Sequence, residues 1–174
     1  YEFTTLEVNP GMLEYRGAKI QVMDVPGLIG GAADGRGGGT QVLSVVRNAD
    51  LILIVLDPEE MRYDEITDEV YKAGLRTDIK PPNMKIEKKE RGGINISSTV
   101  DLEIGEDTIK GLMKQNGYTN AEVIIREQMD LDRFIDGLMD NRKYLPSVEA
   151  VNKSDLLDED EREQYGQKYD VLIS

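Results

Sequence analysis

The stretch Leu51-Ile52-Leu53-Ile54-Val55-Leu56-Asp57-Pro58 decides the fold class of this chain. Six consecutive apolar residues that end at an acidic residue and a proline predict a strand buried on both faces, as in the centre of a parallel sheet. An amphipathic helix is expected next, from Pro58 to Leu75. A strand at 147–151, an acidic helix at 156–168 and a final strand at 171–173 continue the pattern. Strands and helices in alternation predict a doubly wound α/β layer.

The residues before this strand predict a hairpin followed by a loop. Two strand-like stretches, at 12–16 and 18–23, flank Gly17, which favours a tight hairpin. The segment from Gly27 to Gly39 then holds seven of the chain's 17 glycines. Such a segment cannot hold a helix by propensity, so we expect a loop that moves or approaches a ligand closely. A short helix is expected at 40–48.

The middle of the chain departs from this alternation and predicts a unit of its own. The prolines in Ile79-Lys80-Pro81-Pro82 should end the preceding helix. Alternating apolar residues follow at 84–104, with a turn at Gly92-Gly93. The elements expected after them are a helix at 108–116, a strand at 121–126 and a helix at 131–140. We therefore expect an α+β domain at 79–144, inserted into a layer made of residues 1–78 and 145–174.

The composition limits the chemistry that the chain can perform. Its 34 acidic and 21 basic residues give a formal net charge of −13, which argues against broad phosphate-driven binding to nucleic acid or an anionic membrane. Because cysteine and histidine are absent, thiolate and imidazole metal ligands and a Ser-His-Asp triad are excluded, and a bound metal must use oxygen ligands. No apolar run is long enough to span a bilayer, so we expect a cytoplasmic protein with neither membrane nor DNA as a partner.

The chain has a single basic cluster, made of Lys85, Lys88, Lys89 and Arg91. A run of charge of this kind is usually the solvated tip of a hairpin. The alternative is a contact with RNA or with a protein partner. The sequence leaves both interpretations open.

A first candidate site begins at Asp24-Val25-Pro26-Gly27, directly after a predicted strand. The carboxyl ends of strands are where open α/β sheets bind ligands. A carboxylate such as Asp24 can hold a magnesium ion through its water shell, and the N–H of Gly27 can reach a terminal phosphate without an intervening side chain. The alternative is a turn in which both residues serve only the geometry of the chain.

A second candidate site is Asn152-Lys153-Ser154-Asp155, which also follows an apolar strand. The carboxylate of Asp155 can accept from both the ring N–H and the exocyclic amine of guanine, and the stem of Lys153 can lie across the ring. Adenine lacks this pair of donors, so the site would select guanine. The alternative is a helix N-cap in which Ser154 or Asp155 serves only as the cap.

A third candidate lies at the start of the chain, in Phe3-Thr4-Thr5-Leu6. The hydroxyl of Thr5 can bind magnesium, and its backbone N–H can bind a γ-phosphate. The alternative is an ordinary strand edge, where threonine is common. Thr5, Asp24-x-x-Gly27 and Asn152-Lys153-x-Asp155 nevertheless follow one another in the order and strand context of a GTPase domain.

With these motifs the chain resembles the Obg-related GTPases, and within them the developmentally regulated GTP-binding protein (DRG) family. The similarity extends over the whole chain. It is carried by Tyr-Glu-Phe-Thr-Thr-Leu (1–6), Gly-Ala-Lys-Ile-Gln (17–21), Asp-Val-Pro-Gly-Leu-Ile (24–29), Gly-Gly-Ile-Asn (92–95), Asn-Arg-Lys-Tyr-Leu-Pro (141–146) and Asn-Lys-Ser-Asp (152–155). The resemblance implies a GTP-hydrolysing switch that binds GTP or GDP with Mg²⁺, acts near the ribosome or in translation, and has a stabilising protein partner.

The resemblance also implies roles for particular residues. Thr5 and Asp24 would act at magnesium, and Gly27 would act at the γ-phosphate. Guanine would be held by Asn152, Lys153 and Asp155, and Ser174 would begin a loop that touches the base. Leu28 stands where many small GTPases place a water-orienting glutamine, so hydrolysis should be slow unless a backbone group, a partner or a cation orients the water. The resemblance implies that this cation is K⁺.

The implied fold is a P-loop-NTPase-type GTPase sheet with an inserted α+β domain that resembles part of a ribosomal small-subunit protein. No G-x-x-x-x-G-K-[ST] loop occurs in these residues, nor do the strand before it and the helix after it, and the family's TGS domain is also missing. We therefore expect a fragment with an incomplete sheet that is inactive alone. The alternative function is a non-catalytic module that binds RNA or protein through the inserted domain.

Overall fold

The computed structural model describes residues 9–25 and 46–174. The chain divides into two compact units, one made of Tyr1–Ile79 with Lys143–Ser174 and the other of Lys80–Arg142. Thr5, Gly27, Leu28 and most of the helix expected at 40–48 lie outside the described residues.

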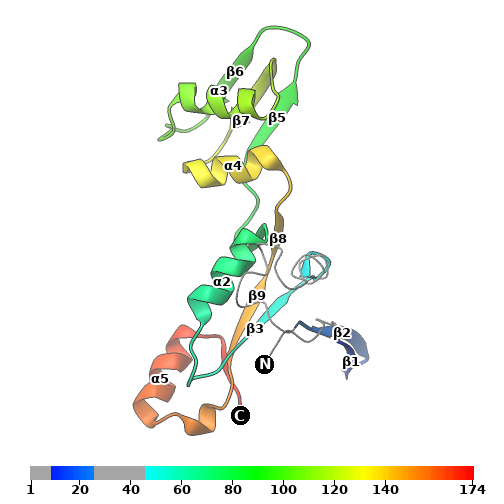
Figure 1. Ribbon diagram of the computed structural model, residues 1–174, viewed down its shortest axis with the longest axis vertical. Coiled ribbons are helices and arrows are strands. Elements are labelled where there is room, and N and C mark those ends of the chain that lie inside the picture. The colour runs from blue at the N-terminus through cyan, green and yellow to red at the C-terminus, as the bar shows by residue number, and fades with distance from the viewer. Residues whose placement is uncertain (1–8, 26–45) are drawn as a thin grey trace, which may run out of the picture. The chain divides into compact units, whose positions relative to one another are not determined.

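The first unit contains a parallel sheet of three strands. These are β3 (Ile52–Leu56), β9 (Ser147–Val151) and β10 (Val171–Leu172), in the order β10-β9-β3. Helix α2 (Tyr63–Lys72) follows β3, and helix α5 (Glu159–Lys168) connects β9 to β10 (Figure 1). The alternation of strand and helix expected from the sequence is confirmed, although α2 is shorter than the 58–75 expected.

Only one face of β3 is buried, so the expectation of a strand buried on both faces is wrong for the described residues. Ile54 and Leu56 pack into a cluster with residues of α2 and α5 and with Tyr169 between α5 and β10. The alternating residues Leu51, Leu53 and Val55 have exposed fractions of 48%, 54% and 50%. The reason is that α2 and α5 both contribute to the clusters on the Ile54 face. A run of apolar residues cannot reveal which of its faces a helix will cover.

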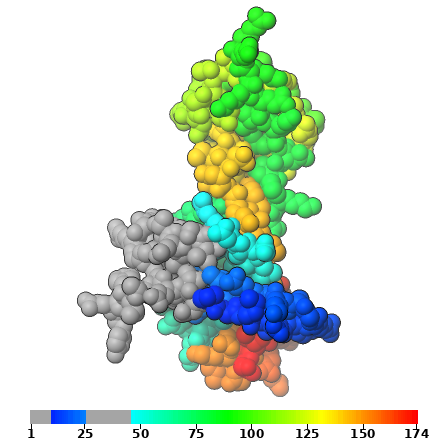
Figure 2. Space-filling model, turned by 90° about the vertical axis from the view of Figure 1, so that its right-hand side faces the viewer, coloured from blue at the N-terminus to red at the C-terminus, as the bar shows by residue number. Residues whose placement is uncertain are grey.

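The predicted hairpin is confirmed. Strands β1 (Asn9–Tyr15) and β2 (Ala18–Asp24) pair antiparallel, with Tyr15 opposite Ala18. Arg16 and Gly17 connect them with φ values of 48° and 83°, the positive pair that a two-residue hairpin turn requires. The side chains of β2, drawn in blue in Figure 2, are exposed. Among the described residues, the hairpin forms a sheet separate from β10-β9-β3.

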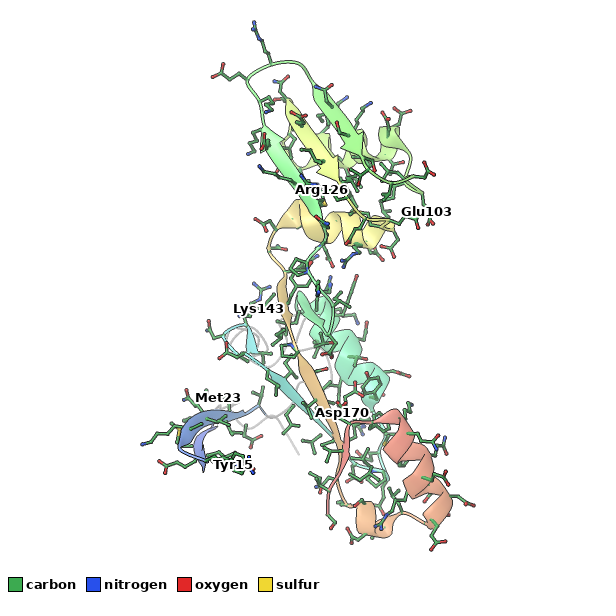
Figure 3. All side chains as sticks on the ribbon, turned by 180° about the vertical axis from the view of Figure 1, so that it is seen from behind. Tyr15, Met23, Glu103, Arg126, Lys143 and Asp170 are labelled. Carbon is green, nitrogen blue, oxygen red and sulfur yellow. The ribbon has the colours of Figure 1, made fainter. Side chains whose placement is uncertain are left out.

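A second pair of strands, β4 (Leu75–Thr77) and β8 (Lys143–Leu145), was not expected from the sequence. They run parallel, and the N–H of Lys143 donates to the carbonyl of Gly74 over 3.0 Å. Lys143, at the start of β8, is labelled in Figure 3. Strands of three residues are too short to show a period of two, which is why the sequence did not reveal them.

The second unit has a mixed sheet with two helices on one face. Strand β7 (Ala121–Ile125) lies between β5 (Met84–Lys88), to which it is antiparallel, and β6 (Ile94–Ser98), to which it is parallel. Helices α3 (Glu106–Gln115) and α4 (Leu131–Met139) supply Ile109, Met113, Phe134 and Leu138 to the core. Gly92 and Gly93, where a turn was expected, have φ values of 107° and 74°, but the strands on either side of them are not paired with each other, because β7 lies between them.

Candidate functional site

The segment Asn152–Asp155 lies at the carboxyl end of the parallel sheet. The N–H of Asn152 donates to the carbonyl of Leu56, the last residue of β3, over 2.8 Å. The N–H of Ser154 donates to the carbonyl of Ile173, directly after β10, over 2.9 Å. The segment is thus tied to both strands that flank β9, and the sheet fixes its position.

Lys153 has a backbone conformation that is rare for a residue with a side chain. Its φ and ψ are 54° and 37°, in the left-handed region. The conformation is held by hydrogen bonds on both sides, because Asn152 and Ser154 are tied to β3 and β10 and Leu156 donates to the carbonyl of Lys153 over 3.0 Å. A strained conformation that its surroundings maintain is typical of functional sites.

The structure does not support the interpretation of Ser154 or Asp155 as a helix cap. The short 3-10 helix Ser154–Leu156 has no side-chain cap. Helix α5 is capped instead by Asp158, which accepts from the N–H of Glu161 while the Glu161 side chain accepts from the N–H of Asp158. Asp155 is therefore an exposed carboxylate that the helix does not need for its start.

Lys153 forms an ion pair that the sequence did not reveal. Its Nζ lies 2.6 Å from Oδ2 of Asp57, the first residue after β3. The other carboxylate oxygen of Asp57 accepts from the N–H of Glu59 over 3.0 Å. The hydrogen bond from Lys153, followed by that from Glu59, lowers the pKa of Asp57, and the same contact with Asp57 raises the pKa of Lys153. The signal that could have identified Asp57 is an acidic residue at the end of a strand that neighbours the strand before Lys153.

Ser174 lies beside the same loop. The residue before it, Ile173, donates its N–H to the carbonyl of Val151 over 2.9 Å and accepts from Ser154. The structure thus brings together four of the candidate residues at one end of the sheet. These are Asn152, Lys153, Asp155 and Ser174.

Among the described residues, no contact places Asp24 next to Asn152, Lys153, Asp155 or Ser174. It is the last residue of β2, where it pairs with Asn9. The neighbouring Val25 packs against a cluster that contains Ile52, at the start of β3, and Leu145, before β9. The segment Asn152–Asp155 lies at the other end of β3 and β9, beyond their last residues. The meeting of the two turns around one ligand therefore stays a prediction.

The basic cluster of the second unit is partly neutralised by carboxylates. Glu87 pairs with Lys85 at 2.6 Å and with Lys89 at 3.0 Å, and Lys89 also lies 3.5 Å from Glu122. Hydrogen bonds from Lys85 and then Lys89 lower the pKa of Glu87 to about 2. The ammonium of Lys88 lies 5.1 Å from the ring centre of Tyr118. Because two of its four basic side chains are paired with carboxylates, the cluster gives less support to an RNA contact than its sequence alone.

The described part of the chain has neither a cluster of metal-binding side chains nor a membrane-spanning helix. In residues 9–25 and 46–174, no three acidic side chains are grouped so as to hold a metal ion. No helix in these ranges is long and apolar enough to cross a membrane.

Comparison with known proteins identifies the family. Residues 1–88 match the family model described as "50S ribosome-binding GTPase", and residues 91–174 match the one described as "C-terminal region of MMR_HSR1 domain". An uncharacterised GTP-binding protein of Halobacterium salinarum is 52% identical, over 91% of this chain and 43% of its own length. Ribosome-interacting GTPase 1 of Saccharomyces cerevisiae is 42% identical over 94% of this chain and 45% of its own length.

Human developmentally-regulated GTP-binding protein 2 is 39% identical, over 99% of this chain and 48% of its own length. The chain spans less than half the length of each of these three relatives. The matches to them nevertheless extend over nine tenths of this chain or more. The chain therefore belongs to the family of 50S ribosome-binding GTPases, with DRG proteins among its relatives.

Proposed function

We propose that this chain carries the guanine-binding part of a GTP-hydrolysing switch of the DRG kind. The observation that carries the proposal is the segment Asn152–Asp155, which is tied by backbone hydrogen bonds to β3 and β10 and holds Lys153 in a left-handed conformation. The exposed carboxylate of Asp155 supports it, because α5 is capped by Asp158 and leaves Asp155 available to a ligand.

Base recognition follows from the chemistry of three side chains. Asp155 accepts hydrogen bonds from the ring N–H and the exocyclic amine of guanine. The aliphatic stem of Lys153 covers one face of the ring, while its ammonium pairs with Asp57. Asn152 supplies an amide that can donate and accept at the same edge, and Ser174 begins a loop beside the base. A base without the paired donors leaves the carboxylate without partners, which gives selectivity for guanine.

Phosphate and magnesium would be bound by the residues near the start of the chain. Thr5 and Asp24 would hold Mg²⁺, and Gly27 would donate its N–H to the γ-phosphate. Their chemistry fits the metal, because Thr5 offers a hydroxyl oxygen and Asp24 a carboxylate, and Mg²⁺ prefers oxygen ligands. When bound, Mg²⁺ neutralises charge that develops on the phosphate oxygens. Leu28 can neither donate nor accept a hydrogen bond, so a backbone group, a partner or K⁺ must orient the attacking water.

We further propose that the full-length protein works on the ribosome in the cytoplasm. The matching family is described by its binding to the 50S ribosome, and one relative carries a ribosome-interacting name. The inserted unit offers surface for RNA or a protein partner. The alternative of a non-catalytic module that acts through this unit is less well supported, because Glu87 pairs with two of its basic side chains, Lys85 and Lys89.

Substitution of Asp155→Asn in the full-length protein tests the guanine assignment. Asparagine cannot accept from both guanine donors, so the affinity for GDP should fall by about 100-fold, since a hydrogen bond to a charged group contributes about 1.5–3 kcal/mol. The affinity for xanthosine diphosphate should rise, because xanthine offers an acceptor where guanine has an amine. Asp160→Asn, an exposed position on α5, is the matched control and should change neither affinity. Unchanged GDP binding by Asp155→Asn would disprove the assignment.

A further inference from the structure

Asp57 and Lys153 lie just beyond the carboxyl ends of the neighbouring parallel strands β3 and β9. Leu56 and Asn152 are joined by a backbone hydrogen bond of 2.8 Å, and Asp57 and Lys153 each follow one of these two residues. The distance between their backbones is therefore set by the sheet. Across it, Oδ2 of Asp57 and Nζ of Lys153 are 2.6 Å apart. The ion pair thus connects the end of β3 with the segment Asn152–Asp155.

The carboxylate of Asp57 is itself held in place. Its Oδ1 accepts from the N–H of Glu59 over 3.0 Å, and Glu60 donates its N–H to the carbonyl of Asp57 over the same distance. Both bonds form a turn directly after β3. The carboxylate is therefore oriented before it meets the ammonium of Lys153.

We propose that Asp57 is a positioning residue for guanine, which orders the Lys153 side chain so that its stem is ready to lie across the base. The inference rests on the proposed function, because it assumes that the segment Asn152–Asp155 binds a base. It adds a residue that lies outside the guanine motif.

The physical reason is the flexibility of lysine. A free lysine side chain loses much of its rotational freedom when it is fixed against a ligand. An ion pair to an anchored carboxylate removes part of this freedom before the ligand arrives, which raises affinity through preorganisation. Both side chains are partly exposed, at 47% for Lys153 and 36% for Asp57, so the effect should be modest and should weaken with added salt.

Preorganisation of Lys153 predicts an effect that does not depend on the edge of the base. The stem would contact the ring face, which guanine and hypoxanthine share, whereas Asp155 would contact the edge, where hypoxanthine lacks the amine. Loss of Asp57 should thus lower the affinities for GDP and for inosine diphosphate by the same factor. Loss of Asp155 should change the ratio of the two affinities.

The test is Asp57→Asn in the full-length protein, with calorimetric titration of GDP and inosine diphosphate at low and high salt. Asparagine keeps an oxygen that can accept from the N–H of Glu59, so the turn is retained while the ion pair is lost. The matched control is Asp68→Asn, which removes another exposed ion pair of 2.6 Å, to Lys72 within α2. Asp57→Glu keeps the charge and should recover part of the loss.

We expect Asp57→Asn to lower the affinity for both diphosphates by about three- to fivefold at low salt and by less at high salt. Asp68→Asn should leave both affinities unchanged, and its midpoint of thermal unfolding should be similar to that of Asp57→Asn. Affinities of Asp57→Asn equal to those of the control, or a changed ratio between the two bases, would overturn the inference alone. If the wild-type protein binds neither diphosphate, the proposed function itself fails.

Discussion

The hydroxyl of Tyr63 donates a hydrogen bond to Oε1 of Glu149, and this bond ties the first residue of α2 to the middle of β9. The residues are 86 positions apart in the chain, with the whole second unit between them. The ring of Tyr63 also meets the edge of Tyr169, with ring centres 5.8 Å apart. Side chains thereby hold α2 to β9 and to the residue that follows α5.

Substitution of Tyr63→Phe should lower stability by about 1 kcal/mol at neutral pH, because it removes one hydrogen bond and keeps the ring. The hydrogen bond to Glu149, followed by burial, raises the pKa of Tyr63 from 10.0 to about 12. A tyrosine whose pKa is higher in the folded than in the unfolded state stabilises the fold fully when the pH is below its unfolded-state pKa. This stabilisation is lost as the pH rises through its folded-state pKa. The wild-type advantage should therefore disappear between about pH 10 and 12. Urea unfolding across this range measures it.

The control for this experiment is Tyr71→Phe, since the described structure gives the Tyr71 hydroxyl no hydrogen bond and its ring contact with Arg76 is retained. A similar loss of stability in both variants would contradict the role given to the Tyr63–Glu149 bond. So would a wild-type advantage that persists above pH 12.

Two helical glycines of the second unit should respond in opposite ways to alanine. At Gly111 in α3, an added Cβ meets nothing within 4 Å, so Gly111→Ala should stabilise the unit by about 0.5–1 kcal/mol through helix propensity. At Gly137 in α4, the Cβ would lie 2.3 Å from Sδ of Met84 and 3.0 Å from its Cγ. Met84 would have to move, and overpacking should cost about 1–3 kcal/mol. Thermal unfolding of the two variants should show shifts of opposite sign, and a stabilised Gly137→Ala would refute the close packing of α4 on β5.

Much of the first unit could be predicted because its strands and helices are long enough to show a pattern. The strand 147–151 has the bounds that were expected, and the hairpin turn lies at Gly17 as predicted. The open face of β3 could not be predicted, because apolar residues on both sides of a strand do not tell whether a helix covers them. The order β5-β7-β6 could not be predicted either, since a glycine turn indicates where the chain reverses but not which strand becomes its neighbour.

The candidate site was predictable in the part that a short motif defines. Asn152, Lys153 and Asp155 follow one another directly, so a single turn brings them together. Asp57 lies 96 residues from Lys153, and only the pairing of β3 with β9 makes them neighbours. Asp24 shows the converse, because its motif was evident in the sequence but its hairpin forms a separate sheet among the described residues.

The isolated 174-residue chain should bind GTP weakly. Its sequence contains the proposed guanine motif but no G-x-x-x-x-G-K-[ST] loop, which supplies most phosphate contacts in GTPases. Titration with a fluorescent GTP analogue should therefore show no saturation in the micromolar range. Folding of the chain can be checked by circular dichroism in the same samples. Micromolar binding by the folded chain would show that these residues hold the phosphates without such a loop.

The substitution Leu28→Gln addresses how the attacking water is oriented. If the side chain of Leu28 limited the reaction, a glutamine at this position would orient the water, as the corresponding residue does in other GTPases, and would raise the hydrolysis rate by more than about tenfold. We expect less than a tenfold increase in the full-length protein, because we assign the orientation of water to a backbone group, a partner or a cation. Single-turnover hydrolysis measures the rate, and Leu28→Met, which keeps an apolar side chain, is the control. A rise of more than tenfold with glutamine but not with methionine would show that the side chain at position 28 limits the reaction.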